Sequence, residues 1–292
     1  MFKLLTVVLI LLMAMLGTSC TNGNIAERTT SPNVPKTENL LKAKSWANFD
    51  FRTRSNWQNP EIGEQKMVDF LASISLLESN RQQNEFTYFL KKASTNKEAL
   101  TYFEKTITRY LNDPNSPLYN VESYLSFLRA YLKSGLLSGN NKEIHNSLLQ
   151  QLARNEIGKK AIDFQFTLSD RHIQKLSDYK ANYFILFFYD PMCQHCQESI
   201  HALRKDKNIN RLLESSNSKL FMINPWGNDE KWRHQQQFFP KEWISGITNP
   251  TFLQEGNYHL PAAPSVFLLD GNFRFLLRNK QMHNVISYIK NT

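Results

Sequence analysis

The hydrophobic pattern of this 292-residue chain changes its period near Ile157. Before that point, apolar residues recur every three or four positions, as on one face of an amphipathic helix. After it, short segments either alternate between apolar and polar residues or are continuously apolar, which is typical of strands. The succession predicts a small all-helical domain over residues 45–155 and an α/β domain over residues 156–292.

Five apolar stripes make up the helical part, and polar segments at 112–117 and 138–141 separate some of them. The stripes cover residues 67–77, 86–90, 100–111, 121–132 and 144–152. We interpret their leucine and aromatic residues as a hydrophobic core. This part has no cysteine and a single histidine, His145, which we expect on the surface. We therefore predict no chemistry there.

The first twenty residues have the pattern of an export signal. An apolar run from Leu4 to Leu16 has the length of a signal-peptide core, whereas a membrane span needs about 20 residues. Small residues precede Cys20, which resembles a bacterial lipoprotein signal in which the cysteine is lipidated. We expect a signal peptide over 1–19, lipidation at Cys20 and a flexible tether over 20–44; the alternative is an ordinary cleaved signal. Thr21 follows the cysteine and favours the outer membrane, with the protein facing the periplasm.

If Cys20 is acylated, the remaining thiols are Cys193 and Cys196, three residues apart. A structural disulfide stabilises most when it closes a long loop, and this pair closes a very short one. The pair follows a continuous apolar run at 183–189, typical of a buried strand, and precedes a helical pattern over about 197–213. The start of a helix favours the thiolate form of a cysteine. The pattern predicts a reactive cysteine pair at a strand–helix junction.

The segment from Tyr189 to Cys196, YDPMCQHC, resembles the active site of the thioredoxin superfamily, and the likeness extends over about residues 157–292. The chain is similar to the TlpA-type membrane-attached branch and to thioredoxin-family lipoproteins of the Bacteroides group, whose helical half has no assigned role. The resemblance implies an α/β thioredoxin-like fold, in which helices flank a central mixed sheet. It further implies a thiol–disulfide oxidoreductase with Cys193 as nucleophile and Cys196 as resolving thiol. The two would form a redox-active disulfide, without a metal or organic cofactor.

The resemblance also implies a proline loop packed against the cysteine pair. Pro264, which immediately precedes an apolar strand pattern, matches the family's cis-proline, and Pro261 is the weaker candidate. In the family, the backbone of the preceding residue, here Ala263, pairs with the bound substrate. Ala263 and Pro264 are therefore the expected substrate-binding residues.

Four residues next to the cysteines, Asp190, Met192, Gln194 and His195, distinguish this motif. His195 lies between the cysteines and is expected to stabilise the Cys193 thiolate, unless it is simply an exposed residue at the start of a helix. The family usually has Trp where Met192 stands, and many members have Pro where Gln194 stands, so substrate contacts and redox potential differ. The buried acid of thioredoxins has no evident counterpart, and Asp190 is a candidate turn residue.

Three other kinds of cysteine site fit less well. The spacing from Cys196 to His201 opens like a zinc knuckle, but the chain has no second cysteine pair. Haem attachment needs a histidine directly after the second cysteine, where this chain has Gln197. A peroxiredoxin would have a Thr-rich loop before its cysteine, and no such loop precedes Cys193.

Charge and composition limit the partners. The chain has 35 Lys and Arg against 26 Asp and Glu, a net charge of +9. It has no run of five or six basic residues, so we expect no nucleic-acid binding. The expected partners are protein thiols or disulfides as substrates, a membrane redox partner, and the membrane itself through the lipid anchor. The prediction is an exported, lipid-anchored thiol–disulfide oxidoreductase; the alternative is a non-enzymatic binding lipoprotein on a thioredoxin-like scaffold.

Overall fold

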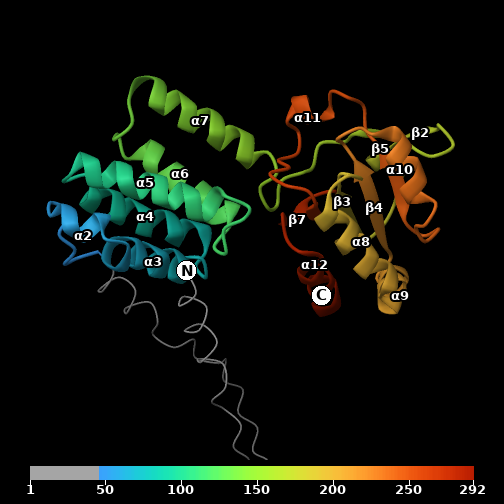
Figure 1. The fold of residues 1–292 in the computed structure, drawn as a ribbon, viewed down its shortest axis with the longest axis horizontal. Helices are drawn as coiled ribbons and strands as arrows, with labels where there is room; N and C mark the ends of the chain where they lie inside the picture. Colours follow the sequence, from blue (N-terminus) through green and yellow to red (C-terminus); the bar gives the residue numbers. More distant parts are fainter. Residues whose placement is uncertain (1–45) are drawn as a thin grey trace, which may run out of the picture. The chain divides into compact units, whose positions relative to one another are not determined.

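The computed structural model describes residues 46–292 (Figure 1). The predicted signal peptide, the predicted lipidation of Cys20 and the predicted tether over 20–44 lie outside the described residues. Within 46–292, no helix is long and apolar enough to cross a membrane. All of the described residues belong to one compact unit.

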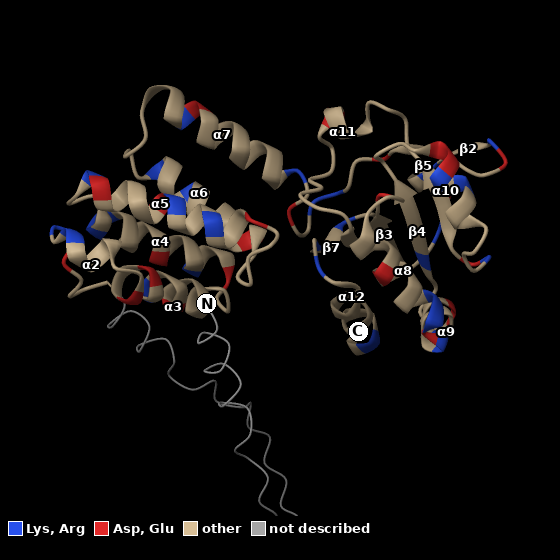
Figure 2. Cartoon of the chain, viewed as in Figure 1, with Lys and Arg blue, Asp and Glu red and all other residues tan. Residues whose placement is uncertain are grey.

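The N-terminal part is built from helices, as the apolar stripes predict. They are α2 (Arg54–Gln58), a π-helical turn (Pro60–Glu64), α3 (Gln65–Ile74), α4 (Ser79–Ala93), α5 (Lys97–Asn112), α6 (Val121–Lys133) and α7 (Gly139–Ala153). Asn96 and Asn120 begin α5 and α6, because their side-chain oxygens accept hydrogen bonds from backbone N–H groups of the first turn. Lys and Arg are interspersed with Asp and Glu on these helices (Figure 2).

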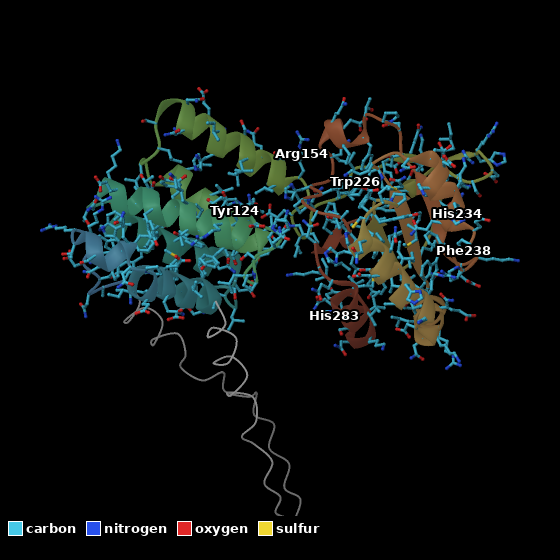
Figure 3. All side chains as sticks on the ribbon, in the orientation of Figure 1. Tyr124, Arg154, Trp226, His234, Phe238 and His283 are labelled. Carbon is cyan, nitrogen blue, oxygen red and sulfur yellow. The ribbon has the colours of Figure 1, made fainter. Side chains whose placement is uncertain are left out.

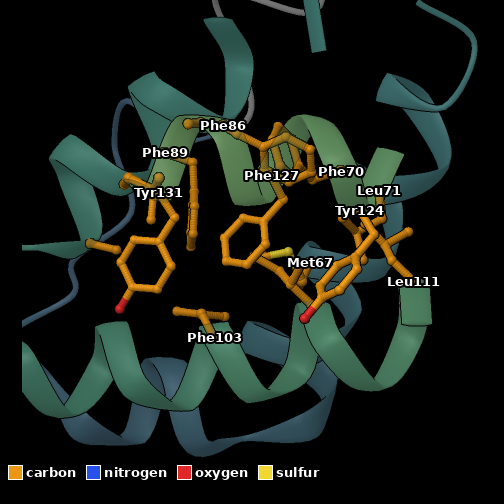
Figure 4. Packing of buried hydrophobic residues seen from close by; sticks show 14 of the residues in the cluster. Met67, Phe70, Leu71, Phe86, Phe89, Phe103, Leu111, Tyr124, Phe127 and Tyr131 are labelled. Carbon is orange, nitrogen blue, oxygen red and sulfur yellow. The ribbon is translucent and has the colours of Figure 1, made fainter. Parts of the chain in front are cut away.

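Aromatic side chains fill the core of the helical part (Figure 4). The Trp46 ring is fully buried, and its centre lies 4.9 Å from that of Phe89 and 5.4 Å from that of Phe103. Several of these contacts are edge-to-face, an arrangement that adds about 0.5–1.5 kcal/mol per pair to the gain from burial. The aromatic stripes of the sequence are therefore core, as predicted.

His145 differs from the prediction of a surface residue. Its side chain is only 15% exposed, its Nε2 lies 3.0 Å from Glu104 Oε1, and its ring packs edge-on against Tyr131. The hydrogen bond to Glu104 raises the pKa of His145 above its usual value, and this effect outweighs the opposing effect of burial. The two partners are 41 residues apart, so the local sequence gives no sign of the pair.

The C-terminal part contains a seven-stranded mixed sheet in the order β2-β1-β5-β4-β3-β6-β7. Its strands are β1 (Gln165–Thr167), β2 (Ile173–Lys175), β3 (Tyr183–Phe188), β4 (Ser218–Asn224), β5 (Ile244–Ile247), β6 (Ser265–Asp270) and β7 (Phe275–Arg278). β3 pairs in parallel with β4 and antiparallel with β6, so the strand that precedes the cysteines lies inside the sheet. The α/β fold class is confirmed.

Successive β3 side chains point to opposite faces of the sheet. Ile185 and Phe187 join one buried cluster with residues of α8 (Gln194–Lys205), α9 (Lys207–Ser215) and α12 (Met282–Asn291). Phe184, Leu186 and Phe188 join a second cluster with residues of α11 (Phe252–Glu255) and the segment before β1. The remaining helices are α10 (Asp229–Gln236) and a 3₁₀ turn (Leu176–Asp178). The continuous apolar pattern of this strand reflects burial on both faces.

Two features of the C-terminal part correct the sequence prediction. The helix expected over 197–213 begins earlier, at Gln194, and is divided into α8 and α9 at Asp206. Asp206 ends α8 and caps α9, since its side chain accepts the Asn208 N–H at 2.9 Å. The short strand β5 was not predicted; at Gly246 a Cβ atom would lie 2.4 Å from the ring of buried Phe166.

Candidate functional site

The loop between β3 and α8 positions the first cysteine. Asp190 Oδ1 accepts the Met192 N–H at 2.8 Å, and the Asp190 carbonyl accepts the Cys193 N–H at 3.0 Å. Pro191 follows Asp190 in this turn, where its fixed φ suits the second position. Asp190 is therefore the turn residue that holds Cys193 at the start of α8.

Cys193 is the N-cap residue of α8 and is partly exposed, whereas Cys196 is 0% exposed. The Cys193 sulfur accepts the Cys196 N–H at 3.2 Å, so an unpaired N–H of the helix start points at it. A helix N-terminus stabilises negative charge, and a thiolate at this position benefits from it. In this structure both cysteines are free thiols.

The environment of Cys196 favours its protonated form. Burial raises the pKa of the Cys196 thiol well above its usual value, and the hydrogen bond with Cys193 raises it further. Tyr189 OH is buried near this thiol, and burial raises the Tyr189 pKa in the same way. The sequence assigned no role to Tyr189, which opens the motif and ends the apolar run.

The loop that follows α11 brings a second element to the cysteine pair. The Ala263–Pro264 peptide bond is cis. The Ala263 carbonyl lies 3.3 Å from Cys193 Sγ and accepts a hydrogen bond from it, although the residues are 70 positions apart. Ala263 and Pro264, rather than Pro261, therefore form the part of the loop beside Cys193.

His195 lies at the surface of the helix start. Its side chain is 85% exposed, and its Nδ1 is 3.5 Å from Glu198 Oε2. Gln194 also reaches Glu198, with Nε2 donating at 3.0 Å. An acidic neighbour offsets the charge that a protonated His195 would bring. A stabilising effect of His195 on the Cys193 thiolate stays a prediction.

Two clefts are lined by residues of α8 and of the loops that flank the cysteine pair. The first has a volume of about 600 Å³ and is lined by the loop of Pro264, by one side of α8 and by the start of α12, with Pro114 and Tyr119 from the helical part. The second, of about 370 Å³, is lined by Pro191 and by residues of α8 and α10. Gln197, to which the sequence assigned no role in the site, lines the second cleft, and its Nε2 donates to the Pro191 carbonyl at 3.0 Å. Over residues 46–292, no group of three or more His, Cys, Asp or Glu is arranged to hold a metal ion.

Comparisons with known proteins agree with this architecture. Residues 157–271 match the model of the AhpC/TSA family, and residues 27–155 match a domain of unknown function, DUF5106. The crystal structure of a thioredoxin-like protein from Bacteroides caccae is 27% identical, covers 93% of this chain and 99% of its own, and has a TM-score of 0.81. The C-terminal domain of an uncharacterized protein from Bacteroides fragilis is 30% identical over 47% of this chain and 99% of its own, with a TM-score of 0.45. None of the curated proteins matches the chain.

The fold and the matched regions define the class of protein. Its C-terminal part is a thioredoxin-like domain that matches the model of the AhpC/TSA family, which confirms the resemblance found in the sequence. The domain that precedes it is a helical DUF5106 domain, in agreement with the prediction of a helical domain of unknown role.

Proposed function

We propose that this protein is an exported, lipid-anchored thiol–disulfide oxidoreductase that exchanges disulfides with protein substrates through Cys193 and Cys196. The observation that carries the proposal is the unequal placement of the two sulfurs. Cys193 Sγ is partly exposed at the start of α8 and accepts a helix N–H, while Cys196 is fully buried behind it. Such a pair has one thiol that a partner can reach and one that it cannot.

The reaction follows from this placement. The Cys193 thiolate attacks one sulfur of a substrate disulfide, a bond forms between the two sulfurs, and the other substrate sulfur leaves as a thiolate that takes up a proton. Cys196 then loses its proton and attacks Cys193 Sγ, which releases the second substrate thiol. The substrate gains two electrons and the Cys193–Cys196 pair becomes a disulfide. The same steps in reverse oxidise a dithiol, and the reduction potential of the pair sets the direction.

The loop at Ala263 and Pro264 is the proposed substrate contact. The Ala263 carbonyl lies 3.3 Å from Cys193 Sγ, so a polypeptide whose sulfur has reached Cys193 must pass along this loop. A backbone carbonyl there offers an acceptor to the substrate backbone without selecting a side chain. This contact suits a protein that acts on varied polypeptides.

Trapping experiments test which cysteine attacks the substrate and which cysteine resolves the mixed disulfide. Cys196→Ser removes the thiol that resolves the mixed disulfide and keeps the attacking thiol. Mixed disulfides between Cys193 and substrates should therefore accumulate and be visible on a non-reducing gel. Cys193→Ser removes the attacking sulfur and should give no adduct. Equal adducts in both variants would contradict the assigned roles. Absence of adducts in Cys196→Ser, together with no insulin-reducing activity of the wild type, would favour the non-enzymatic binding protein.

Membrane attachment is a separate part of the proposal and is supported by the apolar segment before Cys20. A lipid anchor at Cys20, in the outer membrane and facing the periplasm, would place the domain near exported proteins and near a membrane redox partner. Cys20→Ala should move the protein out of the membrane fraction or block its processing. Fatty-acid labelling that persists in this variant would refute lipidation at Cys20.

A further inference from the structure

The ionisable residues that line the cleft between α8 and α10 are all basic. Its walls carry His201 and Arg204 on α8 and Lys231 and His234 on α10, and no carboxylate is part of its lining. All four side chains are exposed. Among residues 46–292, neither Arg204 nor Lys231 has an ion-pair partner, so their charges are available to a ligand.

One end of this cleft lies beside the turn that holds Cys193. Pro191 and Gln197 line it, and the hydrogen bond from Gln197 Nε2 to the Pro191 carbonyl closes that end. Pro191 precedes Cys193 by two residues, a length of chain that spans at most about 7 Å. A molecule whose sulfur is bonded to Cys193 therefore has the cleft within reach.

The spacing along α8 sets the length of the cleft. Gln197, His201 and Arg204 are separated by four and three positions, which places them on one face of the helix. The helical rise puts Arg204 about 10 Å further along α8 than Gln197. Three residues of an extended chain cover the same length. The substrate sulfur is bonded to Cys193, which lies eleven positions before Arg204, so the distance along α8 from Cys193 is about 16 Å, the length of about five extended residues. A side chain about five positions from the reacting cysteine of a substrate can thus reach Arg204.

An exposed aromatic residue accompanies these charges. Phe238 is 51% exposed, the Arg204 guanidinium carbon lies 5.7 Å from its ring centre, and the His234 ring lies 5.5 Å from it (Figure 3). Stacking on a ring restrains a guanidinium while its N–H groups stay free, and a planar guanidinium suits a carboxylate. Arg204 is in this way oriented for an anion before any ligand arrives.

We propose that this cleft binds a carboxylate of the substrate, so that the preferred substrates are polypeptides with an acidic residue about five positions from the reacting cysteine. The inference rests on the proposed function and names its substrate class. Attraction between the basic cleft and such a segment raises the rate of encounter and holds the substrate in register with Cys193.

Three fluorogenic peptide disulfides test this proposal. They share one sequence and carry Glu, Gln or Lys five positions from the cysteine, and the measured quantity is the second-order rate constant for their reduction by the reduced protein. Because one exposed ion pair changes binding by about 1.5- to 5-fold, the two fixed charges should make the Glu peptide about three- to tenfold faster than the Gln peptide. The Lys peptide should be slowest, and the preference should shrink as salt is added.

Two double variants test which residues cause the preference for the Glu peptide over the Gln peptide. R204A/K231A should bring the Glu and Gln rates together and leave the Gln rate unchanged, which also shows that the variant is folded. R211A/K219A removes one Arg and one Lys that line a different cleft and should keep the preference. Equal Glu and Gln rates in the wild type, or a preference that survives in R204A/K231A, would overturn the inference while the proposed function stands. Failure to reduce any of the three peptides would overturn the proposed function as well.

Discussion

Replacing His259 with asparagine should make the protein less sensitive to acid. His259 lies between α11 and β6, its Nε2 is buried without a hydrogen-bond partner among the described residues, and burial lowers its pKa from 6.5 to about 4. The positive charge of nearby Arg278 contributes to this shift. In the folded protein, protonation of His259 would therefore bury an unpaired charge.

The sign and size of the effect follow from linkage. Below the pKa of about 6.5 of an unfolded histidine, the unfolded chain binds a proton that the folded protein does not, so the free energy of unfolding falls as the pH falls from about 6.5 to about 4. With these two values, the wild type should lose about 2 kcal/mol between pH 8 and pH 5 through this residue. Above pH 7, none of this free energy of unfolding is lost.

Urea unfolding at pH 8 and pH 5 measures this loss in the wild type and in His259→Asn. The variant should lose about 2 kcal/mol less than the wild type, whatever its stability at pH 8. His283→Asn removes an exposed histidine and controls for the loss of a histidine as such. A pH dependence that is the same in the wild type and in His259→Asn would refute the reasoning, because protonation of His259 would then carry no penalty in the folded state.

Three further substitutions and one labelling experiment test other parts of the structure. Arg278→Met should lower the free energy of unfolding by about 1–3 kcal/mol in urea titrations, because the partly buried Glu122 carboxylate, 2.6 Å from Arg278 Nε, and the Leu152 carbonyl lose their donor. Gly246→Ala should cost about 1–3 kcal/mol in the same assay, since the new methyl group meets the ring of Phe166. Iodoacetamide at neutral pH should label Cys193 first in the reduced protein, with Cys196 reacting only after unfolding; equal labelling, followed by mass spectrometry, would contradict the burial of Cys196. His195→Ala should shift the alkylation of Cys193 to higher pH, and an unchanged profile would leave His195 as an exposed residue without effect on the thiolate.

The sequence by itself determined the features that depend on neighbouring residues. The apolar run that became β3, the helical stripes and the place of Cys193 at a strand–helix junction all follow from hydrophobic period and local spacing. These signals are local because a side chain's face on a helix or strand is fixed by its position along that element. The family's active-site motif is equally local, and so the class of protein was evident before the fold.

Only the tertiary structure decided which distant residues meet. The approach of the Ala263 carbonyl to Cys193, the His145–Glu104 pair and the position of β5 between β1 and β4 join segments far apart in the chain. The basic cleft likewise exists because α8 and α10, which begin 35 residues apart, each bring two basic side chains to one groove. The packing of helices sets the His145–Glu104 pair, and the order of strands in the sheet sets the approaches in the C-terminal part. No local pattern of hydrophobicity encodes that packing or that order.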